Sequence, residues 1–234
     1  MEAPTLSVII PIYNEAGTLR ELLRRVRLAG GEARTWRQQI ICVDDASTDG
    51  CWEILQEEAR EGDLRVLRHE RNAGKGAAVW TGLQQADGDI LIIQDADLEY
   101  DPEDYTTLLR PIFTGKSQVV YGSRFLGEHR AMFFWHSVGN KFLTLVTNLL
   151  YDTTLTDMET CYKVLTAEVA RGITLRSRRW GFDPEITARI LRQGYRIYEV
   201  PISYAGRERW EGKKISWKDG FTVLFTLLRY RFFK

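Results

Sequence analysis

Residues 90–97 read ILIIQDAD, an apolar run of four residues that leads into an acidic turn. A similar arrangement occurs twice earlier in the chain: residues 6–15 read LSVIIPIYNE, and residues 39–45 read QIICVDD. Short apolar runs rich in β-branched residues are typical of strands that are buried on both faces. The three runs therefore predict inner strands of a parallel sheet, each followed at its carboxyl end by polar side chains.

Helical patterns separate these strands. Thr18–Leu28 repeats leucine and valine every three or four residues, a second pattern follows Gly50, and a third begins near Lys75. Leu64–Leu67 adds a further strand. This alternation predicts βαβ units, whose right-handed crossovers bring the carboxyl ends of the strands to one edge of the sheet. Because open α/β sheets bind ligands at that edge, we expect the polar clusters to converge on one crevice.

The rest of the chain continues the α/β pattern, and 234 residues support one large core, so we expect a single domain over residues 1–234. We expect helices at Pro102–Phe113, Ala131–Tyr151, Asp183–Arg192 and Phe221–Phe233, strands at Gln118–Tyr121 and Arg196–Tyr204, and a mobile loop at Trp210–Lys218. Hydrophobic residues make up 44% of the chain and charged residues 27%, which excludes a disordered or collagen-like protein. The three cysteines form no C-x-x-C pair, which excludes a disulfide scaffold and a zinc ribbon.

Charge is unevenly distributed along a chain whose net charge is zero. Residues 171–234 contain 15 basic and 6 acidic residues, so this part carries +9 and the remainder −9. Such asymmetry indicates an anionic partner (a phosphate ligand, a membrane surface or a nucleic acid), and an unevenly charged surface without a ligand is the alternative. No recognised nucleic-acid motif is present, so we expect no nucleic-acid partner. We also expect neither a signal peptide nor a membrane-spanning helix, since no stretch reaches ~20 apolar residues.

The acidic turn after residues 90–93 offers oxygen ligands for a metal ion. Asp95 and Asp97 follow a buried strand, and Glu99 supplies a third carboxylate two residues further on. Mg²⁺ and Mn²⁺ prefer such oxygen ligands and usually keep substrate phosphates in their coordination shell. An isolated D-x-D motif also occurs in solvated acidic turns. The motif of this chain lies at the end of a buried strand, which favours a metal site.

Two further clusters each have a functional and a structural interpretation. Asp44 and Asp45 can accept hydrogen bonds from a base or ribose, or they can cap the helix that follows. Asn72–Gly76 places Lys75 at a helix start, where an anion binds readily, although glycines there also permit close packing. The full Walker A pattern is missing.

Six motifs, in this order along the chain, resemble those of family 2 glycosyltransferases. They are Pro11–Glu15, Val43–Gly50, Asn72–Gly76, Asp95–Asp97, Gly122–Phe125 and Thr156–Lys163, and Arg207 with the loop Gly212–Lys214 extends the match. The later motifs are similar to the polyprenyl-phosphate (dolichyl-phosphate) hexosyltransferase branch, which includes mannosyltransferases. The resemblance implies one catalytic domain of the GT-A type, a Rossmann-like, mostly parallel sheet flanked by helices that binds a nucleotide sugar.

The resemblance also implies roles for individual residues. Those for the nucleotide sugar are Pro11, Tyr13, Glu15, Asp44, Asp45, Lys75, Asp95, Lys213 and Lys214. Those for a Mg²⁺ or Mn²⁺ ion are Asp95, Asp97 and Glu99, and those for the acceptor phosphate are Arg124, Arg130 and Ser137. Arg130 substitutes for a second basic residue that relatives carry four positions before this serine, where this chain has Phe133. The implied catalytic residues are Asp97, Arg124 and Arg207. The resemblance also implies that Arg207 closes over the phosphates with Lys213 or Lys214.

The implied reaction moves a hexose from GDP-mannose or UDP-glucose to a polyprenyl phosphate with inversion. The acceptor is already anionic near pH 7, because its second pKa is ~6, so it needs no strong general base. One alternative is a family 2 transferase that acts on a sugar hydroxyl in polysaccharide assembly, with a carboxylate base near Asp157 or Glu159. Another is a non-catalytic nucleotide-binding or nucleic-acid-binding module, for which Asp95 and Asp97 would be dispensable.

Two amphipathic segments, residues 131–151 and 219–234, carry many large apolar residues. An interfacial helix buries such a face at the headgroup boundary of a membrane, and nearby basic residues add attraction to anionic lipid. Helices that cover the sheet or a dimer partner are the alternative. With the implied lipid acceptor, we expect a peripheral protein at the cytoplasmic face of a membrane.

Overall fold

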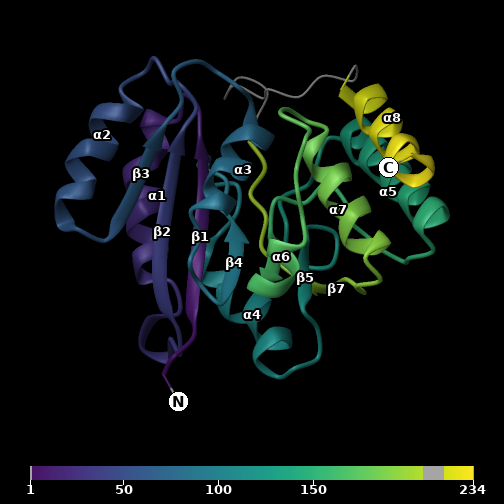
Figure 1. The fold of residues 1–234 in the computed structure, drawn as a ribbon, viewed down its shortest axis with the longest axis horizontal. Helices are drawn as coiled ribbons and strands as arrows, with labels where there is room; N and C mark the ends of the chain where they lie inside the picture. Colours follow the sequence, from purple (N-terminus) through teal and green to yellow (C-terminus); the bar gives the residue numbers. More distant parts are fainter. Residues whose placement is uncertain (1, 208–218, 234) are drawn as a thin grey trace.

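A seven-stranded sheet, in the order β3-β2-β1-β4-β6-β5-β7, runs through the centre of the molecule, with helices packed on both faces (Figure 1). The structure, a computed structural model, describes residues 2–207 and 219–233. The strands are β1 Thr5–Ile12, β2 Arg37–Asp44, β3 Leu64–Arg68, β4 Ile90–Ile93, β5 Val119–Ser123, β6 Lys163–Thr166 and β7 Tyr198–Pro201. The α-helices are α1 Ala16–Leu28, α2 Cys51–Glu58, α3 Lys75–Gln84, α4 Tyr105–Phe113, α5 Phe134–Tyr151, α6 Ala167–Arg171, α7 Phe182–Arg192 and α8 Asp219–Phe232, with 3₁₀ turns at Gly31–Ala33, Ala59–Glu61 and Pro102–Asp104.

The first four strands pair in parallel, as the alternating pattern predicts, and β5 pairs in parallel with β7. β1 lies between β2 and β4 and pairs with both in parallel, and β3 extends the sheet beyond β2. The inward faces of these strands and of α1 form the main hydrophobic core. All of these strands therefore end at the same edge.

The antiparallel strand β6 was not predicted. It pairs antiparallel with β4 and β5, so the sheet is mixed rather than wholly parallel. Its four residues begin with the fully buried Lys163, and a charged residue in so short a segment hides the strand pattern. Its place in the sheet comes from pairing with β4, about seventy residues earlier, which no local pattern encodes.

Most other predicted elements are confirmed, with boundary shifts. The helix predicted at Pro102–Phe113 divides into a 3₁₀ turn and α4, and the strand predicted at Arg196–Tyr204 shortens to β7. α6 was not predicted. The loop predicted at Trp210–Lys218 lies outside the described residues.

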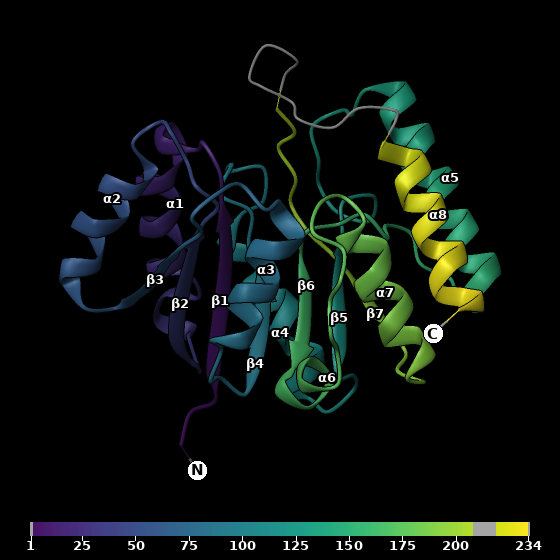
Figure 2. The same ribbon diagram turned by 45° about the horizontal axis from the view of Figure 1, so that its top comes forward.

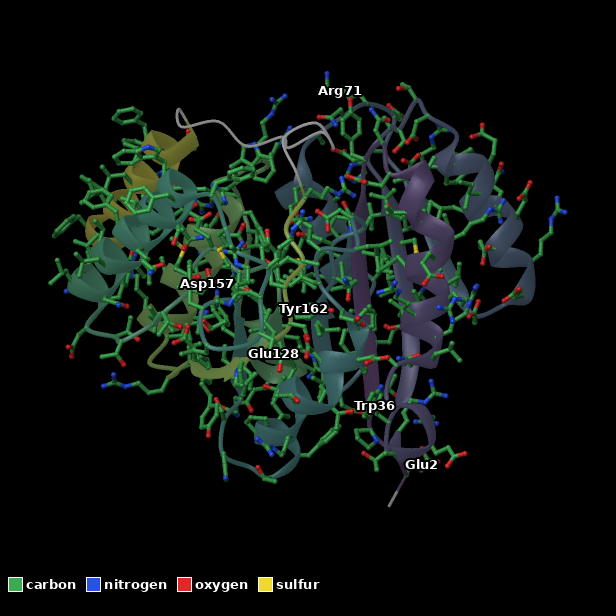
Figure 3. All side chains as sticks on the ribbon, turned by 180° about the vertical axis from the view of Figure 1, so that it is seen from behind. Glu2, Trp36, Arg71, Glu128, Asp157 and Tyr162 are labelled. Carbon is green, nitrogen blue, oxygen red and sulfur yellow. The ribbon has the colours of Figure 1, made fainter. Side chains whose placement is uncertain are left out.

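The two ends of the sheet have different surroundings. In Figure 3, Arg71 lies near the edge at which β1, β2 and β3 end, and Trp36 and Glu2 lie at the opposite edge. The polar clusters that follow β1, β2 and β4 are thus gathered on one side of the molecule, which confirms the predicted convergence.

Helices α5 and α8 pack side by side at one end of the molecule in both views of the ribbon (Figures 1 and 2). A small core of Leu155, Met158, Val223 and Leu227 joins them to the rest of the protein. The two helices expose many large apolar side chains: Phe134, Trp135, Val138, Phe142, Leu145, Leu149, Phe221, Phe225, Leu228 and Phe232. Phe134, Trp135, Phe142 and Phe221 of these line the cavity described below. Within residues 2–207 and 219–233, no helix combines the length and the hydropathy that crossing a bilayer requires.

Candidate functional site

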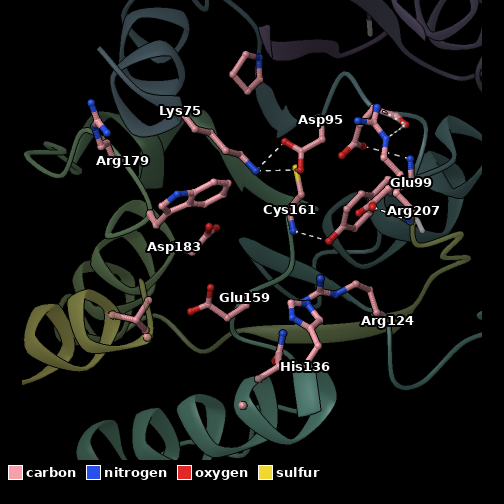
Figure 4. Close-up of a pocket in the computed structure, with 18 of the residues that line it drawn as sticks. Lys75, Asp95, Glu99, Arg124, His136, Glu159, Cys161, Arg179, Asp183 and Arg207 are labelled. Atoms are coloured by element: carbon pink, nitrogen blue, oxygen red, sulfur yellow. Dashed lines mark hydrogen bonds and ion pairs between the residues drawn. The ribbon is translucent and has the colours of Figure 1, made fainter. Parts of the chain in front are cut away.

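A cavity of about 1120 Å³ opens where the predicted polar clusters converge (Figure 4). One wall is polar and comes from the loops after the strands, and the other is apolar and comes from α5 and α8. Predicted site residues that line it are Pro11, Tyr13, Glu15, Asp45, Lys75, Asp95, Asp97, Glu99, Arg124 and Arg207. The cavity wall does not include Asp44, Arg130 or Ser137. Lys213 and Lys214 lie outside the described residues.

Lys75 reaches from the start of α3 to the acidic turn. Its Nζ lies 2.7 Å from Asp95 Oδ1 and 2.9 Å from Oδ2. Burial raises the pKa of the Asp95 carboxyl, but the Lys75 ammonium outweighs burial and leaves that pKa below its usual value. Lys75 thus keeps Asp95 ionised, and it lies where it can also contact a ligand phosphate.

Asp97 carries the least compensated charge of the turn. Burial and the neighbouring carboxylates of Asp95 and Glu99 raise its pKa to about 7, although Arg207 opposes the rise. A divalent cation would neutralise this excess negative charge. The described residues contain no group of three His, Cys, Asp or Glu side chains that could hold a metal ion by themselves. Mg²⁺ often binds through one or two carboxylates together with substrate phosphates, so Asp95 and Asp97 fit a metal that arrives with a diphosphate.

Glu99, the predicted third ligand, has other partners. Its Oε2 accepts a hydrogen bond from the Tyr204 hydroxyl at 2.8 Å, and its Oε1 accepts one from the Arg207 backbone N–H at 2.8 Å. The preceding Leu98 has a φ of +61°, an unusual conformation for a bulky residue that redirects the chain at this point. Glu99 therefore anchors residues 204–207 beside the acidic turn, and the structure does not join it to Asp95 and Asp97 as a three-ligand group.

Arg207 connects two of the loops at the cavity. Its guanidinium lies 2.6 Å from Glu15 Oε2 and 3.2 Å from Oε1, and it donates to the Asp97 carbonyl oxygen at 3.0 Å. The sequence-based expectation was that Arg207 closes over phosphates. Its contacts in the structure join the loop after β1 to the acidic turn, so its guanidinium already lies next to the metal-binding candidates.

Asp45 holds the loop that precedes α3. Its Oδ1 accepts a hydrogen bond from the Ala73 N–H at 2.8 Å and lies 2.7 Å from His69 Nδ1, and its Oδ2 accepts one from the Gly74 N–H at 2.7 Å. These contacts occupy both oxygens. The main role of Asp45 in this structure is therefore to position the loop and Lys75.

Asp44 is fully buried, and one of its oxygens lacks a hydrogen bond among the described residues. Its Oδ1 accepts from the Ser47 N–H at 3.0 Å, a contact within the turn after β2 and not a cap of α2, which begins at Cys51. Its Oδ2 forms an ion pair with Arg68 Nε at 3.2 Å and accepts no hydrogen bond from the described residues. Because Asp44 is buried and absent from the cavity wall, the structure does not bring it to the cavity as the resemblance implied.

The glycines around Lys75 permit close packing. Gly74 has a φ of +96°, and a Cβ on Gly76 would lie 2.3 Å from the Ser177 carbonyl oxygen and 2.8 Å from Phe182 Cβ. The Ala77 N–H donates to the Arg178 carbonyl oxygen at 3.1 Å across this contact. The packing role of the glycines in this motif is supported, and Asn72, Gly74 and Lys75 line the cavity.

Gly76→Ala is expected to lower the free energy of unfolding by about 1–3 kcal/mol, because the new methyl group must displace backbone atoms. Urea unfolding followed by circular dichroism measures the change. The matched control is Gly17→Ala in α1, where a Cβ meets nothing within 4 Å and the substitution should be neutral or stabilising. Equal effects of the two substitutions would contradict the packing role.

Arg124 is held by a buried ion pair with Asp157. Its Nε and Nη2 lie 2.7 Å from Asp157 Oδ2 and Oδ1, and its backbone N–H donates to Oδ2 at 3.1 Å. Arg124 is 7% exposed and Asp157 is fully buried. The pair orients Arg124 at the cavity wall, over the Tyr204 ring. Since both Asp157 oxygens bind Arg124, this carboxylate is poorly placed to act as a base.

The other predicted acceptor contacts do not reach the cavity wall. Arg130 is exposed, and its backbone N–H donates to the Tyr204 carbonyl oxygen at 3.0 Å. Ser137 lies in the first turn of α5, whose His136 and Asn140 line the cavity instead. Sequence reasoning did not single out His136 or Asp183, because each is a single polar residue in a helical pattern.

Comparison with solved structures confirms the GT-A fold. Glucosyl-3-phosphoglycerate synthase from Mycobacterium tuberculosis, solved with Mn²⁺, uridine diphosphate and glucosyl-3-phosphoglycerate, superposes with a TM-score of 0.72. The superposition covers 99% of this chain and 81% of that chain, at 19% sequence identity. At that identity the likeness establishes the fold alone, a mostly parallel mixed sheet flanked by helices.

Comparison with curated sequences establishes the family. Dolichol-phosphate mannosyltransferase from Pyrococcus furiosus is 32% identical over 214 residues, and the match covers 89% of this chain but only 58% of that protein. Undecaprenyl-phosphate mannosyltransferase from Micrococcus luteus is 32% identical over 220 residues, covering 88% of this chain and 85% of that protein. The family model for "Glycosyl transferase family 2" matches residues 7–173. The chain is therefore a glycosyltransferase and belongs to family 2.

Proposed function

We propose that this glycosyltransferase moves a hexose from a nucleotide sugar to a polyprenyl phosphate at a membrane surface. The observation that carries the proposal is the composition of the cavity at the strand ends, where an acidic turn and basic side chains face an apolar wall from α5 and α8. A diphosphate fits the polar wall and an isoprenoid chain fits the apolar one. The names of the two mannosyltransferase relatives support the acceptor and make GDP-mannose the first donor to test, with UDP-glucose second.

In this proposal, Asp95 and Asp97 hold Mg²⁺ or Mn²⁺ on the donor diphosphate. When bound, the ion stabilises the negative charge of the departing nucleoside diphosphate. Lys75 and Arg207, both at the acidic turn, add positive charge beside the diphosphate. Arg124, which Asp157 fixes in one orientation, binds the acceptor phosphate.

The chemistry then depends mainly on positioning. An oxygen of the acceptor phosphate attacks the anomeric carbon, and the bond from that carbon to the donor diphosphate oxygen breaks with inversion. The attacking oxygen is already anionic near neutral pH, so no residue must remove a proton from it. The protein has to bring two anions together, which is the work of fixed cationic groups.

The test is a transfer assay with purified protein, Mn²⁺ or Mg²⁺ and a short polyprenyl phosphate. Labelled GDP-mannose, UDP-glucose and UDP-N-acetylglucosamine are supplied separately, and the label in the organic phase is measured with and without EDTA. Metal-dependent label from one donor is the expected result. Absence of lipid-linked label with every donor, when nucleotide-sugar binding is intact, would instead support a sugar-hydroxyl acceptor.

The membrane part of the proposal rests on the exposed apolar faces of α5 and α8, which would contact lipid of the cytoplasmic leaflet. Leu149 is 76% exposed and Phe225 65% exposed, and neither lines the cavity. Leu149→Ser combined with Phe225→Ser should therefore weaken binding to anionic phospholipid vesicles by at least about tenfold, because apolar area is lost from the interface.

Vesicle sedimentation measures this binding. The matched control combines Leu28→Ser and Phe113→Ser, which remove exposed apolar side chains from α1 and α4, outside the α5 and α8 pair. If the control weakens vesicle binding as much as the α5 and α8 variant does, the proposed membrane surface is wrong.

A further inference from the structure

Two carboxyl groups that the proposed chemistry does not use face the same part of the cavity. Glu159 comes from the segment before β6 and Asp183 from the first turn of α7, and both line the cavity below Lys75 and Asp95 (Figure 4). In the same figure Arg124 and His136 lie on the other side of Glu159. The pair therefore lies between the predicted sites of the donor diphosphate and the acceptor phosphate.

Glu159 is partly buried, and one of its oxygens lacks a hydrogen-bond partner among the described residues. Its Oε1 is inaccessible to solvent and makes no hydrogen bond to any described residue. Burial, together with the negative charges of Asp183 and Asp157, raises the pKa of the Glu159 carboxyl to about 8. The positive charges of Lys163 and Arg124 oppose this rise. A neutral Glu159 near pH 7 has an O–H to donate as well as an oxygen that accepts.

Asp183 differs from Glu159 because it has a cation. The Lys163 ammonium, itself fully buried and bound to the Thr160 carbonyl oxygen, forms an ion pair with Asp183 Oδ1. This ion pair with Lys163 leaves Asp183 as a hydrogen-bond acceptor. One carboxyl that can donate and one that only accepts thus border the same space.

Two carboxyl groups with no metal site between them among the described residues make this space unfavourable for a phosphate. An ionised carboxylate repels the phosphates of both substrates, whereas a neutral group with several hydroxyls satisfies a donor and an acceptor at once. We propose that Glu159 and Asp183 bind ring hydroxyls of the donor hexose and determine which sugar is accepted. This inference rests on the proposed function, since it names the residues that recognise the sugar in that reaction.

The experiment measures binding without the acceptor. Isothermal titration calorimetry with Mn²⁺ compares each nucleotide sugar (GDP-mannose, UDP-glucose and UDP-N-acetylglucosamine) with its nucleoside diphosphate, and the ratio of the two affinities reports the sugar's contribution. Glu159→Leu should reduce that ratio for the preferred donor by about tenfold to a hundredfold, while affinity for the nucleoside diphosphate stays unchanged. Glu159→Gln, which can still donate and accept, should change the ratio less than about threefold. The matched control, Glu128→Leu, replaces an exposed glutamate outside the cavity and should leave both affinities unchanged.

The outcomes separate the two proposals. An unchanged ratio in Glu159→Leu, with nucleoside diphosphate still bound, would overturn the sugar-binding role and leave the proposed transferase function intact. Binding of no nucleotide sugar by the wild-type protein would overturn both. If Glu159→Leu loses turnover while its affinity ratio stays unchanged, Glu159 acts in the reaction step and its role as a hydroxyl-binding residue is overturned.

A stability measurement checks the protonation of Glu159 independently of any ligand. The folded-state pKa lies above the unfolded-state value, so the contribution of protonated Glu159 to stability is complete below about pH 4.5 and is lost as the pH rises through about 8. The melting temperature of the wild type should therefore fall relative to that of Glu159→Gln between pH 5 and pH 8.5. Parallel curves for the two proteins would contradict a neutral Glu159.

Discussion

Replacing Asp97 with asparagine is expected to lower the initial rate of hexose transfer by at least about a thousandfold. Asp97 is the carboxylate with the least compensated charge at the acidic turn, and Asp95 already has Lys75 as its cation. An amide at position 97 leaves only one carboxylate for the metal, and a loss of about 4 kcal/mol of transition-state stabilisation corresponds to this factor. The transfer assay at saturating Mn²⁺ measures it.

The matched control for this variant is Asp87→Asn, the same chemical change at an exposed carboxylate that pairs with Arg65 on the surface. It should keep nearly full activity. Asp97→Asn should remain folded, because it removes one of three neighbouring carboxylates and so relieves repulsion. A variant that is folded and retains more than about a tenth of the wild-type rate would show that Asp97 does not hold an essential metal.

Replacing Arg124 with methionine is expected to lower the free energy of unfolding by about 3–5 kcal/mol. The substitution leaves Asp157 with a buried charge and no cation, and breaking a buried ion pair from one side carries a cost of this size. Urea unfolding at pH 7 measures it. The same variant should also lose transfer activity, because Arg124 is the cationic group proposed to bind the acceptor phosphate.

Two further variants separate these effects. Arg124→Met combined with Asp157→Leu removes both charges and should recover most of the lost stability without recovering activity. Arg130→Met, at an exposed position outside the cavity wall, should change stability by less than about 0.5 kcal/mol. If Arg124→Met is no less stable than Arg130→Met, the buried pair does not contribute to folding as argued here.

Candidate site residues were predicted best where they directly follow a buried strand. Asp95, Asp97 and Pro11 all line the cavity, because an apolar run identifies the strand and the topology of βαβ units brings the ends of parallel strands together. The resemblance to family 2 also placed Arg124 and Arg207 correctly at the cavity. Arg130 and Ser137 were assigned by distance along the chain from a family motif, and they do not reach the cavity wall.

The sequence by itself determined the α/β class, the positions of the first four strands along the chain and the edge at which the site forms, because these follow from local periodicity and from the handedness of crossovers. Only the tertiary structure decided which polar side chains are free to meet a ligand. Three other carboxylates of the same chemistry as Asp97 already have partners. Backbone N–H groups bind the oxygens of Asp45, Tyr204 and a backbone N–H bind those of Glu99, and Arg124 binds those of Asp157. Such partners come from distant parts of the chain, and the desolvation that makes Glu159 and Asp97 hard to ionise exists only after those parts have packed together.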